Sequence, residues 1–257
     1  MVTMKKQRHA NASESLWIRG FHTVKSMLKE KPEQVDLLVL VGRHPGHRLL
    51  VALARTHDIP FTNNLQRVPE SLRKKKHSVA FARLSAAPYE AFENILEGIS
   101  SSSIFILLDH LQDPTNLGNL LRSAAAVGAD AILLPKHRGV RLTPTVAQIA
   151  AGALAYIKLC RYGSLQYTIR RLQERGVWVV AADPFGTDPW YEMRTEGPMA
   201  LVIGHEGKGL TNTARQLCDQ AVRIPMKNVE SLNAATTAAI LLFEIVRQRR
   251  SCSSASR

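Results

Sequence analysis

Three short stretches of the chain combine polar side chains with small residues in a way that suits a ligand site. The first is DPTNLGNLLRSAAAVG, at residues 113–128. Arg122 is the only charge between Asn116 and Ala129, on a predicted helix built largely of leucine and alanine. A solvated surface helix usually carries more charge than this. Arg122 therefore either points outward at an edge or is held for an anion.

The second stretch is LVIGHEGKGL, at residues 201–210, where a predicted strand ends in Gly204 and glycines surround Glu206. Glycines let a backbone approach a ligand closely, and open α/β sheets bind ligands at the carboxyl ends of their strands. The stretch is neither a dinucleotide fingerprint nor a Walker A loop, because Lys208 is followed by Gly209 and the spacing differs. A tight turn with a surface glutamate is the alternative.

The third stretch is RIPMKNVESLNAATTAAILLFE, at residues 223–244. Ser231 and Asn233 precede a helix without any charge from residue 232 to 243, and the open start of a helix attracts ligands. Alone, Ser231 is more often just an N-cap, and Asn233 just a polar residue of the first turn. No histidine and acid accompany Ser231 in a nucleophile pattern, so serine hydrolase chemistry is not indicated. The histidines of the chain are dispersed. His110 and His205 lie near the predicted site, but for each of them a polar loop residue is the simpler interpretation.

The elements that must position these stretches alternate regularly after residue 104. Apolar segments such as IFILLDHL, AILLP, VWVVAAD, ALVIG and AVRIP predict strands. Amphipathic segments between them predict helices, including one at about 144–155 and one at SLQYTIRRLQERG that Gly176 ends. Apolar strands that alternate with helices predict a parallel sheet covered on both faces.

A smaller α/β unit is predicted before this region, at residues 15–85. GFHTVKSMLKEK carries Val24, Met27 and Leu28 on one helical face, and VDLLVLVG is a buried strand. The segment that follows, residues 86–103, ends in a run of serines, which marks it as a linker. The predicted organisation is a basic arm at 1–14, the small domain at 15–85, this linker, the large domain at 104–250 and a tail at 251–257.

The net charge of the chain is +13, and most of the excess lies in the first third. Residues 1–85 hold 16 Lys or Arg against 6 Asp or Glu, whereas the remainder holds 18 against 15. The densest run is Arg73, Lys74, Lys75 and Lys76. A basic domain beside a nearly neutral one indicates a polyanionic partner, in the first place nucleic acid. A solubilising surface is the alternative.

Cysteine usage and hydropathy limit the protein class further. The three cysteines, Cys160, Cys218 and Cys252, lack metal-ligand spacing and fit a reducing compartment, so we expect no metal site and a cytoplasmic location. No apolar run is long enough to cross a bilayer, and the polar, basic start is not a secretory signal. We expect no membrane partner.

In this order, the three stretches resemble the three motifs of the SpoU (TrmH-type) RNA ribose 2′-O-methyltransferases. The matching segments are NLGNLLR at 116–122, GHEGKGL at 204–210, and IPM with SLN between 224 and 233. IRGFHTVKSMLKE also resembles the start of the L30e-like substrate-binding domain of the large-subunit rRNA guanosine methyltransferases in this family. Near Asn228 the turn is one residue shorter than usual and lacks its habitual glycine; asparagine tolerates positive φ.

The resemblance implies an α/β fold whose C-terminal parallel-sheet methyltransferase domain contains a trefoil knot, preceded by a small L30e-like α/β RNA-binding domain. It also implies S-adenosylmethionine as methyl donor and a homodimer with the site near the interface. A knot is a rare exception to the usual threading of chains.

The resemblance assigns roles residue by residue. Arg122 would act at the target ribose, with Asn116, Glu206, Ser231 and Asn233 completing the catalytic site. The donor would contact Gly204, Ile224, Met226, Leu232 and Asn233. RNA would bind Arg19 and His22 as well as Arg73, Lys74, Lys75 and Lys76. Because the pKa of arginine exceeds about 12, an electrostatic role suits Arg122 better than that of a base.

The implied activity is methyl transfer to a ribose 2′-hydroxyl in RNA, and by domain layout the preferred substrate is a guanosine of 23S rRNA. A tRNA enzyme and an adenosine-directed rRNA enzyme are alternatives within the same class. A non-catalytic RNA-binding or ribosome-assembly factor is the alternative from another class.

Overall fold

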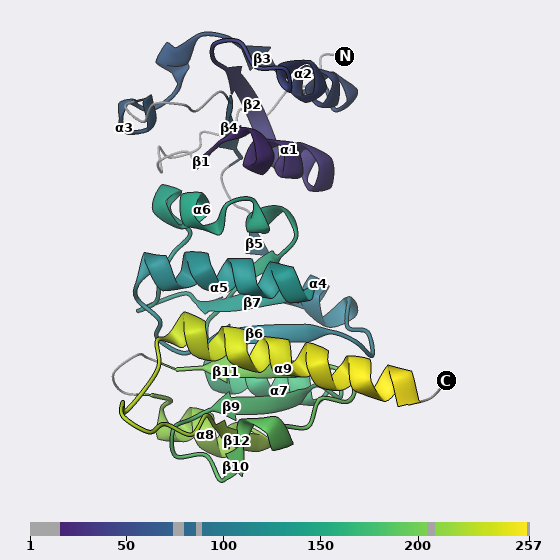
Figure 1. Ribbon diagram of the computed structural model, residues 1–257, viewed down its shortest axis with the longest axis vertical. Coiled ribbons are helices and arrows are strands. Elements are labelled where there is room, and N and C mark those ends of the chain that lie inside the picture. Colours follow the sequence, from purple (N-terminus) through teal and green to yellow (C-terminus); the bar gives the residue numbers. More distant parts are fainter. Residues whose placement is uncertain (1–15, 74–79, 86–88, 205–208, 256–257) are drawn as a thin grey trace, which may run out of the picture.

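A computed structural model of the chain describes residues 16–73, 80–85, 89–204 and 209–255. Two β-sheets with their helices follow one another along its long axis (Figure 1). Several predicted features fall outside the described residues: the arm at 1–14, the lysines Lys74, Lys75 and Lys76, and Glu206.

The N-terminal sheet has four strands in the order β1-β4-β2-β3. Its strands are β1 (Trp17–Arg19), β2 (Val35–Leu40), β3 (Phe61–Thr62) and β4 (Ala80–Leu84). Its helices are α1 (Phe21–Glu30), α2 (His47–Thr56) and α3 (Glu70–Arg73), with 3-10 turns η1 (Pro32–Gln34) and η2 (Leu65–Arg67). Val24, Met27 and Leu28 are buried on one face of α1, which confirms the amphipathic pattern.

The second sheet has eight strands in the order β10-β12-β9-β11-β6-β7-β8-β5, and all its pairings are parallel. The strands are β5 (Tyr89–Glu90), β6 (Ile104–Leu108), β7 (Ala131–Pro135), β8 (Lys158–Tyr162), β9 (Trp178–Ala182), β10 (Asp188–Pro189), β11 (Met199–Ile203) and β12 (Gln220–Arg223). The helices are α4 (Phe92–Glu97), α5 (Pro114–Val127), α6 (Pro144–Ala150), α7 (Leu165–Gln173), α8 (Asn212–Leu217) and α9 (Ala234–Ala255), with 3-10 turns η3 (Ala153–Ala155) and η4 (Trp190–Glu192).

Helices cover both faces of this sheet, as the strand pattern predicted. On β6, Ile106 packs into the hydrophobic cluster shared with α5 and α9, whereas Phe105 and Leu107 pack into the cluster shared with α4, α7 and α8. Successive side chains of a strand point to opposite faces, so an apolar strand must be covered twice. In Figure 1, α5 and α9 run side by side across one face. Gly118 permits the close approach of α5 to α6, because a Cβ there would lie 2.5 Å from Ile149 Cγ2.

Part of the predicted linker at 86–103 belongs to the second sheet. Tyr89 and Glu90 form the edge strand β5 against β8, and Ile95 and Leu96 are buried from α4. The serine run forms a bonded turn, in which Ser103 is buried. The composition of the segment resembles a linker, but its apolar residues fill the edge of the core.

Two other boundaries differ from the prediction. The helix expected at 144–155 ends at Ala150, because Ala151 and Gly152 adopt positive φ (47° and 95°) before η3 begins. The predicted tail begins inside a helix, because α9 continues to Ala255. Local composition does not reveal either point.

The two sheets are joined by a packed and hydrogen-bonded contact. α1 lies against η3, and one hydrophobic cluster runs from α1 into the second sheet. Lys31 Nζ donates to the carbonyl oxygens of Leu154 (2.9 Å) and Ile157 (2.7 Å). Burial lowers the pKa of Lys31. The small domain is therefore fixed against the part of the second domain that contains α6 and η3.

No helix within the described ranges is long and apolar enough to span a bilayer.

Candidate functional site

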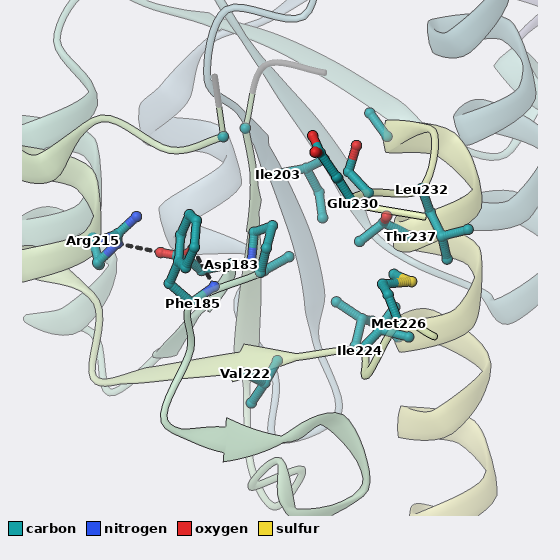
Figure 2. A pocket seen from close by; sticks show the side chains of 17 residues that line it. Asp183, Phe185, Ile203, Arg215, Val222, Ile224, Met226, Glu230, Leu232 and Thr237 are labelled. Carbon is teal, nitrogen blue, oxygen red and sulfur yellow. Dashed lines mark hydrogen bonds and ion pairs between the residues drawn. The ribbon is translucent and has the colours of Figure 1, made fainter. Parts of the chain in front are cut away.

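A cavity of about 230 Å³ lies at the carboxyl ends of β9, β11 and β12, against the start of α9 (Figure 2). Parallel strands bring their carboxyl ends to one edge of the sheet, where ligands bind in open α/β folds. The cavity is lined by Ala182, Asp183, Pro184, Phe185, Ile203, Gly204, Gly209, Arg215, Val222, Ile224, Met226, Glu230, Ser231, Leu232, Ala234, Thr237 and Leu241.

Five of the predicted site residues line this cavity: Gly204, Ile224, Met226, Ser231 and Leu232. They come from two stretches that are separated by α8 and β12 in the chain. The wall next to α9 is apolar, because the side chains of Ile224, Met226 and Leu232 face the cavity there (Figure 2).

Gly204, directly after β11, lies against the backbone of Gly209 and Leu210. A Cβ on Gly204 would lie 2.5 Å from both the carbonyl carbon and oxygen of Gly209 and 2.7 Å from the nitrogen of Leu210. These are backbone atoms, which cannot rotate away as a side chain would. The glycine therefore keeps two backbone segments in contact at the cavity wall.

Asn233 links the start of α9 to the start of α5. Its Oδ1 accepts from the backbone N–H of Ala235 (2.9 Å) and of Thr236 (3.3 Å), so Asn233 caps α9. These bonds orient the amide, whose Nδ2 then donates to Asn116 Oδ1 at 2.6 Å. Asn116 is only 3% exposed. Neither residue lines the cavity, and Ser231 does not cap the helix.

Arg122 does not line the cavity. It is exposed on α5, six residues beyond Asn116. An α-helix rises about 1.5 Å per residue, so Arg122 lies roughly 9 Å further along the axis. The structure thus brings Asn116 and Asn233 together and leaves Arg122 on the outer face of α5.

The segment around Asn228 does not use a left-handed conformation, although asparagine tolerates one better than most residues. The described residues with positive φ that are not glycine are Asp58, His110, Arg138 and Ala151. Asn228 is exposed and absent from this group. The segment from Met226 to Ser231 therefore reaches α9 without the conformation that a glycine would supply.

Sequence reasoning missed a polar wall on the other side of the cavity. Asp183 is buried at the end of β9, forms an ion pair with Arg215 of α8, and accepts from Phe185 N–H at 2.9 Å. The guanidinium of Arg215 lies 5.8 Å from the centre of the Phe185 ring, which is 82% exposed. Figure 2 shows this wall opposite Met226. The position of Asp183 as the last residue of the predicted strand VWVVAAD was the available signal.

Two further carboxylates belong to this edge of the sheet. Glu230 lines the cavity from the segment before α9. Asp109, buried at the end of β6, accepts from Thr211 N–H (3.3 Å) and Oγ1–H (3.2 Å) and pairs with His110 Nδ1 at 2.5 Å. Because Thr211 caps α8, Asp109 fixes the segment that follows Gly209.

The predicted RNA-binding residues that are described lie in the N-terminal domain, away from the cavity. His22 is exposed and contacts the Phe21 ring edge-on at 5.3 Å. Arg19 Nη1 is buried without a hydrogen-bond partner among the described residues. Arg73 donates to the carbonyls of Val68 and Gln66, both at 2.5 Å, so part of its guanidinium stabilises its own turn.

The described cysteines argue against nucleophilic thiol chemistry. Burial raises the pKa of Cys160 to about 11 and that of Cys218 to about 12, so neither thiol supplies a thiolate nucleophile near neutral pH. No cluster of potential metal ligands occurs within the described ranges. The cavity combines apolar side chains, backbone edges and carboxylates, which suits binding of a small, partly cationic molecule.

Known proteins resemble this chain in sequence and fold. The model of the SpoU rRNA Methylase family matches residues 103–243. The 23S rRNA (guanosine-2′-O-)-methyltransferase RlmB of Photobacterium profundum is 36% identical over 241 residues, which cover 91% of this chain and 98% of that protein. The RlmB of Haemophilus influenzae is 37% identical over 242 residues, covering 90% and 97%.

Solved structures agree with the sequence comparison. The SpoU methyltransferase AviRb from Streptomyces viridochromogenes superposes with a TM-score of 0.79 at 25% identity, over 92% of this chain and 90% of that one. An AdoMet-bound rRNA methyltransferase from Sinorhizobium meliloti gives a TM-score of 0.77 at 23% identity, over 91% and 87%. The latter likeness concerns the fold alone.

The link between Asn233 and Asn116 predicts graded losses of stability. Asn233→Ser keeps an oxygen that can cap α9 but removes the donor to buried Asn116, so we expect a loss of about 1–2 kcal/mol. Asn233→Ala also removes the cap and should lose about 1 kcal/mol more. Free energies of unfolding from urea titrations measure both, with Thr236→Ala, at an exposed position of the same turn, as control. A serine variant as stable as the parent would show that the link contributes nothing.

Proposed function

The chain belongs to the SpoU rRNA methylase family, and we propose that it transfers a methyl group from S-adenosylmethionine to the ribose 2′-hydroxyl of a guanosine in 23S rRNA. The observation that carries the proposal is the convergence of two family motifs on one cavity. Gly204 comes from one motif, and Ile224, Met226, Ser231 and Leu232 come from the other.

The residues of the cavity fit the proposed methyl donor. S-adenosylmethionine supplies a methyl group activated on a positively charged sulfur. The contact between Gly204 and Gly209 leaves backbone at the wall where a side chain would otherwise project. Met226, Ile224 and Leu232 offer an apolar surface to the uncharged parts of the donor. Glu230 adds a carboxylate that favours a cationic ligand, and it forms no ion pair with any described residue.

At the acceptor, the protein must hold the ribose in line with the methyl group and help to remove a proton from a weakly acidic hydroxyl. We assign Arg122 to a phosphate next to the target ribose, where its charge also stabilises the developing alkoxide. Arginine stays protonated in proteins, so it does not act as the base. Asn116, Ser231, Asn233 and Glu206 complete the proposed site, with Asn116 and Asn233 holding the starts of α5 and α9 together.

The position of Arg122 supports a homodimer. Arg122 is exposed on α5, and the neighbouring helix α9 has no charge from Ala234 to Phe243. Phe243, on the same helix, is 53% exposed. A second copy of the chain that covers the outer face of α5 and α9 would bury Phe243. It would also bring Arg122 of one subunit towards the cavity of the other.

We also propose three finer features of architecture and location. The C-terminal segment from β12 to α9 passes through the loops after β9 and β11 as a trefoil knot, which the shared cavity wall supports. The N-terminal domain is an L30e-like RNA-binding domain, whose boundary with the methyltransferase domain we place between β4 and β5. The enzyme acts in the cytoplasm.

Methyl transfer to defined RNAs tests the substrate. Purified protein, labelled S-adenosylmethionine and unmodified 23S rRNA should give one 2′-O-methylguanosine, located by nuclease mapping, while tRNA transcripts stay unlabelled. Label in tRNA or at an adenosine would change the assigned substrate but would support the assigned methyl-transfer reaction. A protein that binds RNA but labels none of these substrates would instead be a non-catalytic assembly factor.

Gly204→Ala should weaken donor binding, because the new Cβ forces the backbone at Gly209 away from the cavity wall. We expect the dissociation constant for S-adenosylmethionine, measured by calorimetry, to rise about tenfold or more, which corresponds to 1.4 kcal/mol. Gly163→Ala is the matched control, because a Cβ there meets nothing within 4 Å. Unchanged affinity in the Gly204 variant would place the donor elsewhere.

Arg122→Ala should lower methyl transfer by at least about 100-fold while donor affinity stays within about twofold. Arg170→Ala, at an exposed position of α7, is the control. Co-expressed Arg122→Ala and Gly204→Ala subunits should regain activity in heterodimers, because one site then has an intact cavity and an arginine from its neighbour. Parallel loss of donor binding and transfer would contradict the role of Arg122, and inactive heterodimers would place it in its own subunit's site.

A further inference from the structure

We propose that the basic loop at residues 136–143, between β7 and α6, binds the phosphate backbone of the RNA substrate beside the nucleotide that enters the cavity. The proposal rests on the RNA methyltransferase function proposed above. It adds a contact surface in the second domain to the basic residues expected in the first.

The basic loop carries positive charge without compensation. Its sequence is KHRGVRLT, with Lys136, Arg138 and Arg141 and no acidic residue. These three side chains and His137 are all exposed. Neither Arg138 nor Arg141 forms an ion pair with a described residue. The C-terminal two thirds of the chain has a small net charge, so this concentration of cations is local.

Backbone hydrogen bonds hold the basic loop against its surroundings. Val140 N–H donates to the carbonyl of Leu111 at 2.7 Å, and Lys136 N–H donates to that of Tyr162 at 2.8 Å. On the outer side, Leu142 N–H donates to the hydroxyl of Tyr89 at 3.1 Å. The loop is thus tied to the ends of β6 and β8 and to β5.

Side-chain contacts and local backbone geometry also fix the conformation of the basic loop. Arg161 donates to the carbonyl of Lys136, and its guanidinium lies over the Tyr89 ring at 5.6 Å from the centre. Arg138 adopts a positive φ of 56°, a conformation that costs energy for residues other than glycine. A fixed loop binds a ligand with a smaller loss of conformational entropy than a loop that must first become ordered.

The basic loop lies between the cavity and the N-terminal domain. β7, which it follows, is two places from β11 in the sheet order, so about 10 Å separates their carboxyl ends. The loop leads directly into α6, which packs against β1 of the N-terminal sheet (Figure 1). RNA held by the first domain, with one nucleotide at the cavity, must pass this part of the sheet edge.

The chemistry of the basic loop fits RNA phosphates better than another anion. Arg138 and Arg141 each carry a planar guanidinium, which matches phosphate oxygens with two parallel hydrogen bonds. Their side chains are exposed on an edge and do not converge in a closed pocket, which suits an extended polyanion. Contacts of this kind position a nucleic acid without reading its sequence.

A charge-removal pair with a matched control tests the proposal. Arg138→Ala/Arg141→Ala removes two charges from the basic loop. Arg170→Ala/Arg175→Ala removes two exposed arginines, one from α7 and one from the turn that follows it. This segment leads into the start of β9 and so lies at the opposite edge of the sheet. Filter binding of a 23S rRNA transcript is measured for the full-length protein between about 0.05 and 0.2 M salt.

We expect the loop pair to raise the RNA dissociation constant about tenfold. The slope of log affinity against log salt should fall by roughly 1–2, since each lost phosphate contact contributes about 0.7–0.9. The affinity for S-adenosylmethionine and the melting temperature should not change. The control pair should bind RNA like the parent protein.

The proposal would be overturned if both double variants changed RNA affinity equally, or if the Arg138→Ala/Arg141→Ala variant bound RNA like the parent protein. Methyl transfer by the parent protein separates this outcome from failure of the proposed function. If the parent protein methylates RNA and the Arg138→Ala/Arg141→Ala variant binds RNA as the parent does, only the RNA-binding role of the basic loop is refuted. If the parent protein transfers no methyl group but the Arg138→Ala/Arg141→Ala variant binds RNA more weakly, the enzyme assignment is refuted and the RNA-binding role of the loop is retained.

Discussion

Parallel pairing of β6, β11, β9 and β12 is the constraint on which the rest of this protein depends. Since neighbouring strands run in the same direction, every connection must return across a face of the sheet, and every strand ends at the same edge. The returning connections place helices on both faces of the sheet, which explains why the strands are continuously apolar. The shared edge at which the strands end brings the segments after β9, β11 and β12 together around one cavity. Fold and site thus have a common cause.

A few polar side chains at this edge hold the gathered segments in place. Buried Asp109 binds Thr211 at the cap of α8, and buried Asp183 binds Arg215 and the backbone of Phe185. Asn233 joins the start of α9 to that of α5. Buried polar groups are costly unless they are paired. These pairs therefore favour one arrangement of the cavity wall over alternatives in which the same groups stay unsatisfied.

The layout along the long axis relates RNA binding to the proposed reaction. The N-terminal sheet and its helices pack on α6 through β1 and on η3 through α1 and Lys31, so this part is fixed in place. The cavity lies farther along the sheet edge, and the basic loop lies between the two. In the proposed function, a fixed distance between the N-terminal domain and the cavity selects a nucleotide by its position in a folded RNA. Such selection needs no contact that reads the base.

Sequence alone determined the type of fold and much of the cavity. Strand and helix periodicity predicted the doubly covered parallel sheet, because burial on two faces demands unbroken apolar strands. The family motifs identified Gly204, Ile224, Met226, Ser231 and Leu232, which line the cavity. Tertiary structure alone decided the rest. Asp183, Phe185, Arg215 and Glu230 join the site because strand order brings their segments together, and no local pattern encodes that order. Arg122 faces outward for the same reason: a helix has several faces, and only its packing partners determine which one is buried.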